Sequence, residues 1–352
     1  MLPGAGTILE NIHPSPPQGR ELVRGFTDIA QAPEEFVARV FPQGNPAERL
    51  RIPALHIGGW FDSLHFWQLD DWHSSLLSPA SEHQFLRMWT NDHEDYPWRP
   101  PGEPLTADFG TDDDVLRTHV ATLLAEPISF FDHYLRGREG RWDAPTVAYE
   151  HARVGRRVSS SWPPRRVVER TFCPDGAGRL LPGGADGGVG DVVWFHDPKD
   201  PVPHPIESEW DQNRNGVPDE SSLHERKDVV VFDTEPVPET LDLVGRMEFS
   251  GTVVSDVPTV PLVARLLDVH PSGAAHLIAA NGIGTTADGV TVFRIRLGDT
   301  AYRLPAGHTL RLALSSALGG QHDQPELIQA PRPLRIGLGL RGTRLSLRID
   351  RL

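Results

Sequence analysis

An apolar run, IPALHIGGW at residues 52–60, most constrains how this chain can fold. It is bounded by a proline and by two glycines, and its apolar residues are continuous rather than alternating. Such a run is typical of a strand buried on both faces of a parallel sheet. Because parallel strands need a long crossover connection, usually a helix, the run predicts an α/β arrangement for this part of the chain.

The residues that follow extend this pattern. SLHFWQLDDWHSSLLS places apolar residues mostly three and four positions apart, which predicts a helix over 63–78, and HQFLRMW predicts the next strand over 83–89. The segment 113–138 reads as a helix that is interrupted by Pro127. The interval between the two strands suits a parallel crossover, so residues 51–140 are predicted to form a β–α–β–α unit.

The pattern of apolar residues changes after GREGRWDAP, at residues 137–145. The helical period disappears, and short alternating runs follow at intervals set by turn residues. This pattern predicts an all-β sandwich or jelly-roll domain over residues 145–352. Residues 1–50 are rich in proline, and one amphipathic helical piece is expected at 32–41.

Charge and composition restrict the partners. The chain has 34 basic and 48 acidic residues, a formal charge of −14, so nucleic acid and anionic membrane are not expected as partners. There is no apolar run long enough for a membrane span and no signal-peptide pattern at the start. The single cysteine, Cys173, excludes an internal disulfide and is interpreted as a packing residue. We expect a soluble, cytoplasmic protein without a cofactor.

Two polar residues stand at the ends of the predicted strands. Asp62 follows the first strand and His93 follows the second, with a helix between them. In an open parallel sheet, side chains that do chemistry sit just past the carboxyl ends of the strands. This order is how one kind of hydrolase presents the acid and the base of a catalytic triad. The alternative is that Asp62 caps the helix near Leu64 and that His93 is an ordinary loop histidine.

Seven segments carry a family resemblance: IPALHIGGWFD, RMWTNDHE, SFFDHYLRG, HDPKDPVPH, ERKDVVVFDTEP, LVARLLDVHPSG and LPAGHTLRLALSS. Taken in this order, they resemble the cocaine-esterase and X-Pro dipeptidyl-peptidase family, the CocE/NonD hydrolases. The resemblance implies an α/β-hydrolase domain with an inserted helical cap, followed by a C-terminal jelly-roll domain. It implies that residues 1–50 are the tail of the cap, 51–140 the C-terminal part of the hydrolase domain, and 145–352 the jelly roll.

The resemblance also assigns roles to residues. It implies that Asp62, in the GGW[FY]D motif, is the triad acid and that His93 is the triad base. The family often has Gly-Pro-Trp-x-His at the base, whereas this chain has two extra residues between Trp89 and His93, so Asp62 is the better supported assignment. Trp60 and Leu64 are candidate substrate contacts, with core packing as the alternative use for the tryptophan.

The nucleophile is expected before Asp62, on a Gly-x-Ser-x-Gly elbow. The only serine there is Ser15, in HPSPP, where prolines block a strand-to-helix turn. The chain therefore resembles a serine hydrolase of esterase, acylase or X-Pro dipeptidyl-peptidase type that lacks its N-terminal strands and its nucleophile segment. We expect it to be inactive alone and to need an N-terminal fragment that supplies the serine before it can cleave a small-molecule ester or amide. The alternative is a non-catalytic remnant or a β-sandwich module that binds carbohydrate or protein.

One further segment, DQNRNGVPDESS, has the spacing of a calcium loop from Asp211 to Asp219. Its twelfth position is Ser222 rather than glutamate, so a plain Asn-Gly turn is the preferred interpretation. No metal is expected elsewhere.

The two halves should differ in solubility. An incomplete parallel sheet exposes strand edges that pair with other chains, so a fragment of residues 1–140 should aggregate when expressed alone. A fragment of residues 145–352 should stay in solution, and equal solubility of the two fragments on centrifugation would contradict this prediction.

Overall fold

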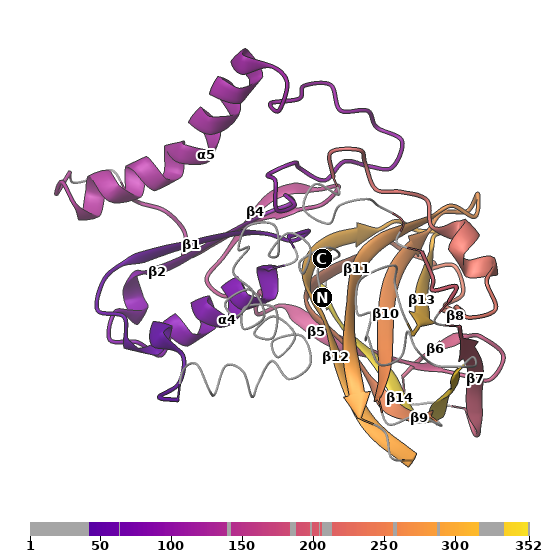
Figure 1. The fold of residues 1–352 in the computed structure, drawn as a ribbon. Helices are drawn as coiled ribbons and strands as arrows, with labels where there is room; N and C mark the ends of the chain where they lie inside the picture. Colours follow the sequence, from indigo (N-terminus) through magenta and orange to yellow (C-terminus); the bar gives the residue numbers. More distant parts are fainter. Residues whose placement is uncertain are drawn as a thin grey trace, which may run out of the picture. The chain divides into compact units, whose positions relative to one another are not determined.

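The computed structural model describes residues 42–62, 64–138, 142–183, 188–197, 199–203, 205, 213–255, 259–286, 289–316 and 334–350 (Figure 1). The chain divides into two compact units. The α/β unit comprises Gln43–Arg165 and Trp210–Val217. The β unit comprises Arg166–Glu209 and Pro218–Leu352.

The α/β unit is built on one sheet. Its elements in chain order are the 3-10 helix η1 (Pro46–Arg49), β1 (Ala54–Gly59), α4 (His65–Ser75), the 3-10 helix η2 (Ser81–His83), β2 (Gln84–Trp89), α5 (Asp113–Tyr134), β3 (Val147–His151) and β4 (Gly155–Ser159). The strands are ordered β1-β2-β3-β4, with β1, β2 and β3 parallel and β4 antiparallel to β3. The predicted β–α–β–α succession over residues 51–140 is therefore confirmed at the level of its elements.

Helices cover both faces of this sheet, with α4 and α5 on opposite sides of β1 and β2 (Figure 1). On the α4 side, Leu69 and Trp72 are fully buried, and β2 contributes the buried Leu86 and Met88. On the α5 side, the ring of Phe130 packs edge-on against Phe85 of β2, with 6.3 Å between centroids. The alternation of side chains along β2 thus supplies apolar contacts to both helices.

The prediction that Pro127 interrupts the second helix is wrong, because α5 runs without a break from Asp113 to Tyr134. A proline inside a helix removes one hydrogen bond and costs roughly 3 kcal/mol. Contacts on both sides of it hold the helix to the sheet: Glu126 pairs with the buried Arg87 of β2, and Phe130 is buried. The side chain of Asp112 caps the helix start by accepting from two backbone amides.

The structure differs from the sequence-based picture at two places in this sheet. All residues of β1 except Gly59 are only half-buried, since β1 forms the edge of the sheet that the described strands make. The predicted boundary near residue 145 assigns β3 and β4 to the β domain, whereas β3 pairs with β2 and both strands belong to the α/β unit. The pairing of β3 with β2 joins residues about 60 positions apart, so no local pattern in either segment could indicate it.

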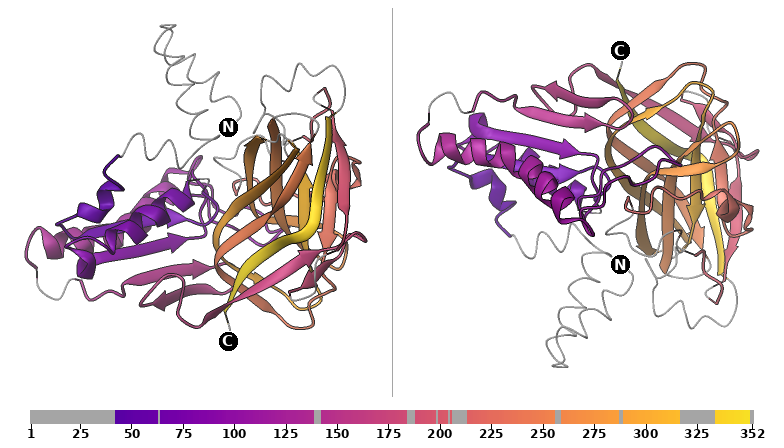
Figure 2. Two further views of the ribbon diagram at one scale, coloured as in Figure 1. Left: turned by 90° about the horizontal axis from the view of Figure 1, so that it is seen from below. Right: turned by 90° about the horizontal axis from the view of Figure 1, so that it is seen from above.

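The β unit consists of antiparallel strands in two layers (Figure 2). Its elements in chain order are β5 (Val167–Pro174), β6 (Leu180–Pro182), β7 (Asp191–His196), the 3-10 helix η3 (Ser221–Glu225), β8 (Val230–Asp233), β9 (Leu241–Ser255), β10 (Thr259–Val269), β11 (Ala275–Thr286), β12 (Gly289–Leu304), β13 (Thr309–Ser315) and β14 (Leu334–Asp350). One sheet has the order β11-β10-β13-β8, and the other has the order β12-β9-β14-β5-β6, with β7 also paired to β14.

Alternating burial along the strands explains why these residues form sheets. In β9, for example, Met247 and Phe249 are fully buried and Glu248 between them is half-buried. Buried polar groups tie the two sheets together: the Tyr302 hydroxyl of β12 donates to Asp268 of β10 at 2.8 Å. The Trp194 indole of β7 likewise donates to Ser316, just after β13, at 2.8 Å.

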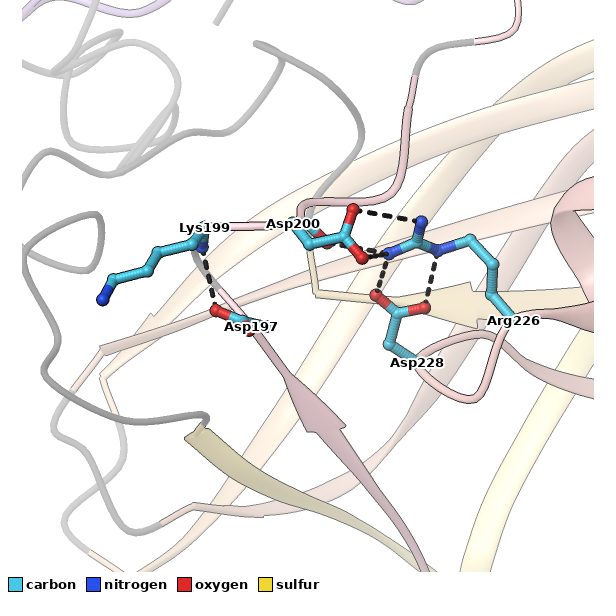
Figure 3. A network of polar contacts seen from close by, with 5 residues as sticks. All are labelled: Asp197, Lys199, Asp200, Arg226 and Asp228. Atoms are coloured by element: carbon cyan, nitrogen blue, oxygen red, sulfur yellow. Dashed lines mark hydrogen bonds and ion pairs between the residues drawn. The ribbon is translucent and has the colours of Figure 1, made fainter.

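Two of the segments that carry the family resemblance meet in the β unit (Figure 3). Arg226, in ERKDVVVFDTEP, makes a paired contact with Asp228 at 2.8 Å for each bond. The same guanidinium donates to the backbone carbonyl of Asp200, in HDPKDPVPH, at 2.7 Å. The hydrogen bonds with Asp228 and Asp200 raise the pKa of Arg226 above its ordinary value. The loop before β8 is thereby fixed to the segment that follows β7.

Some sequence-based expectations fall outside the described residues, namely the amphipathic piece at 32–41, Ser15 and most of the region assigned to the cap. Among the helices that the structure describes, none combines the length and the apolar character needed to cross a membrane.

In the β unit, the charged side chain of Arg311 affects the pKa of a histidine, His224. Arg311 binds Asp233 through two hydrogen bonds of 2.7 Å and also donates to Nδ1 of His224 at 3.0 Å. Because the guanidinium can only donate, this ring nitrogen must carry no proton. Burial and the nearby charge of Arg311 lower the pKa of His224 from 6.5 to about 4.

This lowered pKa predicts how the stability of the protein depends on pH. Between its ordinary and its folded pKa, His224 binds a proton in the unfolded chain and not in the folded chain, so the free energy of unfolding should fall as the pH decreases through this window. Urea unfolding at several values between about pH 6.5 and 5 should show a shallower decline for His224→Asn. His270→Asn, which changes an exposed histidine, is the control. An unchanged slope in His224→Asn would contradict the assignment.

Candidate active site

The parallel pairing of β1 and β2 aligns the carboxyl ends of the two strands. The register runs from Ala54 opposite Gln84 to Gly59 opposite Trp89, without a bulge. Both chains therefore leave the sheet at the same edge. This is the place where side chains of a parallel sheet most often do chemistry.

At both glycines of the GGW motif, a side chain would collide with neighbouring atoms. A Cβ on Gly59 would lie 2.2 Å from the backbone oxygen of Asn91, and one on Gly58 would collide with the side chain of Gln68 on α4. The close approach continues past the strand ends, since the amide of Trp60 donates to the Trp89 carbonyl at 2.8 Å. The absent side chains thus let the loop after β1 lie directly against the loop after β2.

Asp62 and His93 meet at this edge. Oδ1 of Asp62 lies 3.2 Å from Nδ1 of His93, at the long end of the ordinary hydrogen-bonding range. The aspartate side chain is 11% exposed, and the histidine side chain is 35% exposed. A carboxylate that accepts from Nδ1–H fixes the tautomer and makes Nε2 the basic nitrogen. The pair can therefore orient a proton acceptor that solvent and substrate can reach.

The alternative interpretation, that Asp62 caps the helix near Leu64, is not what the structure shows, because Leu64 is the N-cap of α4 and the helix start has no side-chain cap. Asp62 instead fixes the turn before the helix. Its Oδ1 accepts from the backbone amide of Leu64 at 2.8 Å, and its carbonyl accepts from the amide and the ring of His65. These bonds fix the turn that leads into α4. The carboxylate is thus held by this turn while it contacts His93.

A tight turn presents His93. Within it, the amide of Asp92 donates to the Tyr96 carbonyl at 3.1 Å, and the amide of Tyr96 donates to Oδ1 of Asp92 at 2.9 Å. Asp95 has a φ of 66°, a left-handed conformation that aspartate tolerates better than most residues. The amide of Trp98 donates to the Thr90 carbonyl at 2.7 Å and closes the base of the turn.

Sequence reasoning missed one participant, Asn213, which belongs to the calcium-like segment. Its amide donates to Oδ2 of Asp92 at 2.7 Å, and its side-chain Nδ2 donates to the carbonyl of Tyr96 at 3.0 Å. The preferred turn interpretation fits the geometry here, because the amide of Gly216 donates to the Asn213 carbonyl at 3.1 Å with a φ of 82° at the glycine. Nothing in the local sequence indicates that this turn contacts the His93 turn.

Aromatic rings surround the other side of the turn. Tyr96 stacks on Phe109 at 4.4 Å between centroids, and Phe109 stacks on His119 of α5 at 4.1 Å. The Tyr96 hydroxyl donates to Asp108 at 2.8 Å and, with Gly110 and Arg214, holds the pKa of that carboxyl below its ordinary value. A pocket of about 470 Å³ lies against this stack and is lined by Tyr96, Phe109 and His119 among others.

The two residues proposed from sequence as substrate contacts have different environments. Trp60 is 4% exposed, its ring stacks on Trp162 at 4.6 Å, and its indole donates to the Glu150 carbonyl at 2.8 Å. This is the core environment that the alternative interpretation of Trp60 expected. Leu64 is 40% exposed and lies between Asp62 and α4. A substrate contact by Leu64 stays a prediction.

A larger groove, of about 910 Å³, is lined by residues of the β unit that include Glu169, Cys173, Glu235 and Arg344. Neither Asp62 nor His93 lines it. Within the described ranges, no group of three or more His, Cys, Asp or Glu side chains is arranged to hold a metal ion.

The fold and the Asp–His pair can now be compared with known proteins. A family profile described as the X-Pro dipeptidyl-peptidase C-terminal non-catalytic domain matches residues 140–319, more than half of the chain. The fold and the profile together define a hydrolase family whose members carry a C-terminal β domain. The chain belongs to this family, the CocE/NonD hydrolases.

Individual relatives agree with this placement. Cocaine esterase from Rhodococcus sp. (strain MB1 Bresler) is 26% identical over 158 residues, which cover 42% of this chain and 28% of that protein. An aminopeptidase from a marine sediment Thaumarchaeota archaeon has a similar fold, with a TM-score of 0.72 and 17% identity over 95% of this chain and 61% of that one. An α-amino acid ester hydrolase gives a TM-score of 0.68 and 17% identity over 94% and 61%. The chain thus spans less than two thirds of the length of these relatives.

The close approach at Gly59 can be tested directly. Gly59→Ala should push the loop after β1 away from Asn91 and lower the free energy of unfolding by about 1–3 kcal/mol, measured by urea denaturation. Gly176→Ala is a matched control, because its new methyl group would meet only Leu340 at an ordinary 3.8 Å. Equal unfolding midpoints for the two variants would refute the steric explanation.

Proposed function

We propose that this chain supplies the acid and the base of a serine hydrolase that cleaves small esters or amides through an acyl-serine. The observation that carries the proposal is the contact of 3.2 Å between Asp62 and His93, at the carboxyl ends of two adjacent parallel strands. The printed sequence has no Gly-x-Ser-x-Gly elbow. The nucleophile would therefore come from a segment that this sequence does not contain.

In the proposed reaction, Nε2 of His93 accepts the serine proton while the serine oxygen attacks the carbonyl carbon of the substrate. The imidazolium formed faces the Asp62 carboxylate through Nδ1–H, which stabilises the charge. The histidine then gives its proton to the departing alcohol or amine. Nε2 then takes a proton from water, and the oxygen of that water attacks the acyl carbon. The acid leaves as the imidazolium returns the proton to the serine oxygen.

The surface of the α/β unit supports the presence of further strands in the working enzyme. The outer edge of β1 has no partner among the described strands, although parallel sheets are normally covered and continued. Exposed apolar side chains follow one another at three- and four-residue steps along α5: Leu116, Val120, Leu124, Ile128, Phe131 and Leu135. We propose that the α/β unit is the C-terminal part of an α/β-hydrolase domain, that missing strands pair with β1, and that the β unit is a jelly roll.

The names of the relatives suggest the substrate class. An esterase, an aminopeptidase and an amino acid ester hydrolase all release an acyl group from an alcohol or an amine. The same Asp–His pair serves either leaving group, because both need one proton from Nε2. We therefore propose a small-molecule ester or amide substrate, including an X-Pro amide.

The test is to restore the missing nucleophile. The coding region next to this gene should encode a segment with a Gly-x-Ser-x-Gly elbow, and the purified segment should be mixed with the 352-residue chain. Turnover of p-nitrophenyl acetate and of an X-Pro nitroanilide should appear in the mixture only. His93→Ala and Asp62→Ala should each lower that rate by roughly 10⁴-fold or more, as removal of a triad member does.

His270→Ala is the control, since it removes an exposed histidine of the β unit. Hydrolysis by the chain alone that is lost in His93→Ala would show that another residue of this chain is the nucleophile. An active mixture that tolerates both His93→Ala and Asp62→Ala would refute the roles assigned to the pair.

A further inference from the structure

Asn213 lies against the turn that carries His93, although 121 positions separate it from Asp92 in the sequence. It is 1% exposed. Its segment, Trp210–Val217, belongs to the α/β unit, while the chain before and after it belongs to the β unit. A short segment within the β unit's part of the sequence is therefore part of the α/β unit, and it places Asn213 at the candidate site.

The contacts of Asn213 hold the turn from outside. The two carboxylate oxygens of Asp92 have different partners. Oδ1 accepts from the amide of Tyr96 inside the turn, and Oδ2 accepts from the amide of Asn213. The side-chain Nδ2 of Asn213 then donates to the Tyr96 carbonyl at 3.0 Å and to the Thr90 carbonyl at 3.4 Å. One residue thus bonds to both arms of the turn and to the carboxylate that closes it.

Its neighbour fixes the segment that delivers Asn213. The guanidinium of Arg214 donates to Asp108 at 3.0 Å and lies over the ring of Tyr96 at 5.5 Å. The Arg214 carbonyl accepts from Arg99 at 3.0 Å. The segment is consequently anchored to the α/β unit through residues that follow His93, so Asn213 can act as a fixed support.

This support bears on the imidazole because His93 directly follows Asp92. The distance of 3.2 Å between Nδ1 and Asp62 is at the long end of hydrogen-bonding range, so a small rotation of the Asp92 peptide would break the contact. The turn also contains the left-handed Asp95, a conformation that persists where the surroundings hold it. A turn of this kind needs a constraint from outside.

We propose that Asn213 is a positioning residue for His93, which keeps the Nδ1–H of the imidazole directed at Asp62. The inference rests on the proposed function in that it treats Asp62 and His93 as the working pair. It adds to the site a residue that lies within the stretch matched by the family's non-catalytic domain profile, residues 140–319. A purely structural tie would stabilise the α/β unit without any effect on the tautomer of His93.

The test reads the tautomer of His93 in the 352-residue chain. Histidine-labelled protein is examined by long-range nitrogen–proton correlation at mildly alkaline pH, where histidine side chains are ordinarily neutral. The His93 resonances are assigned with His93→Gln. In the unaltered chain, the proton should lie mainly on Nδ1. Asn213→Ala should lower the ratio of the Nδ1–H to the Nε2–H form by roughly five- to tenfold, the effect of losing one net hydrogen bond.

Matched variants separate the explanations. Asn215→Ala, which truncates an exposed asparagine of the same turn, should leave the ratio unchanged. If Asn213→Ala does not fold, as judged by circular dichroism, Asn213→Asp keeps the shape and the backbone donor. Its carboxylate would face the carbonyls of Thr90 and Tyr96 without a donor, so it should lower the ratio as well.

The outcomes distinguish the two proposals. If Asp62→Ala shifts the tautomer and neither Asn213 variant does, the positioning role is overturned and the proposed function stands. If Asp62→Ala has no effect, the pair does not form in solution and both proposals are overturned. A shift with both Asp62→Ala and Asn213→Ala supports the positioning role, whatever the nucleophile test shows.

Discussion

The in-register parallel pairing of β1 with β2 is the contact on which the candidate site depends. It brings the carboxyl ends of two strands to one edge, and the crossover helix α4 occupies the interval between them. Gly59 lets the backbone of Asn91 approach closely enough for the two loops to touch. With these constraints in place, an aspartate three residues past one strand and a histidine four residues past the other can reach each other without a long loop.

The same sheet shows that a local site can rest on distant parts of the chain. β3 extends the sheet beside β2, and its residue Glu150 accepts the indole N–H of Trp60 through its backbone carbonyl. The segment around Asn213 then returns from the β unit's part of the sequence to hold the His93 turn. The loop after β2 thus has hydrogen bonds within its own turn and further ones to Asn213, 121 positions from Asp92.

The difference between local and distant contacts explains which sequence-based predictions were accurate. Apolar periodicity is a local property, and it correctly located β1, α4, β2 and α5 and indicated the all-β character of the β unit. It failed where a distant contact decided the outcome. Glu126 and Phe130 keep α5 continuous through Pro127, and pairing with β2 moves Val147–His151 into the α/β unit. The strand β1 was expected to be buried, but burial requires neighbours that the sequence of the strand cannot supply.

The sequence by itself determined which catalytic groups are available. These are an acid and a base, each just past an apolar strand, in the order that a hydrolase family uses. It determined this because strand ends and residue types can be read locally. Only the tertiary structure decided that Oδ1 of Asp62 and Nδ1 of His93 lie 3.2 Å apart, and that Trp60 belongs to the core. Only the tertiary structure revealed Asn213, because its hydrogen bonds join parts of the chain that no local pattern relates.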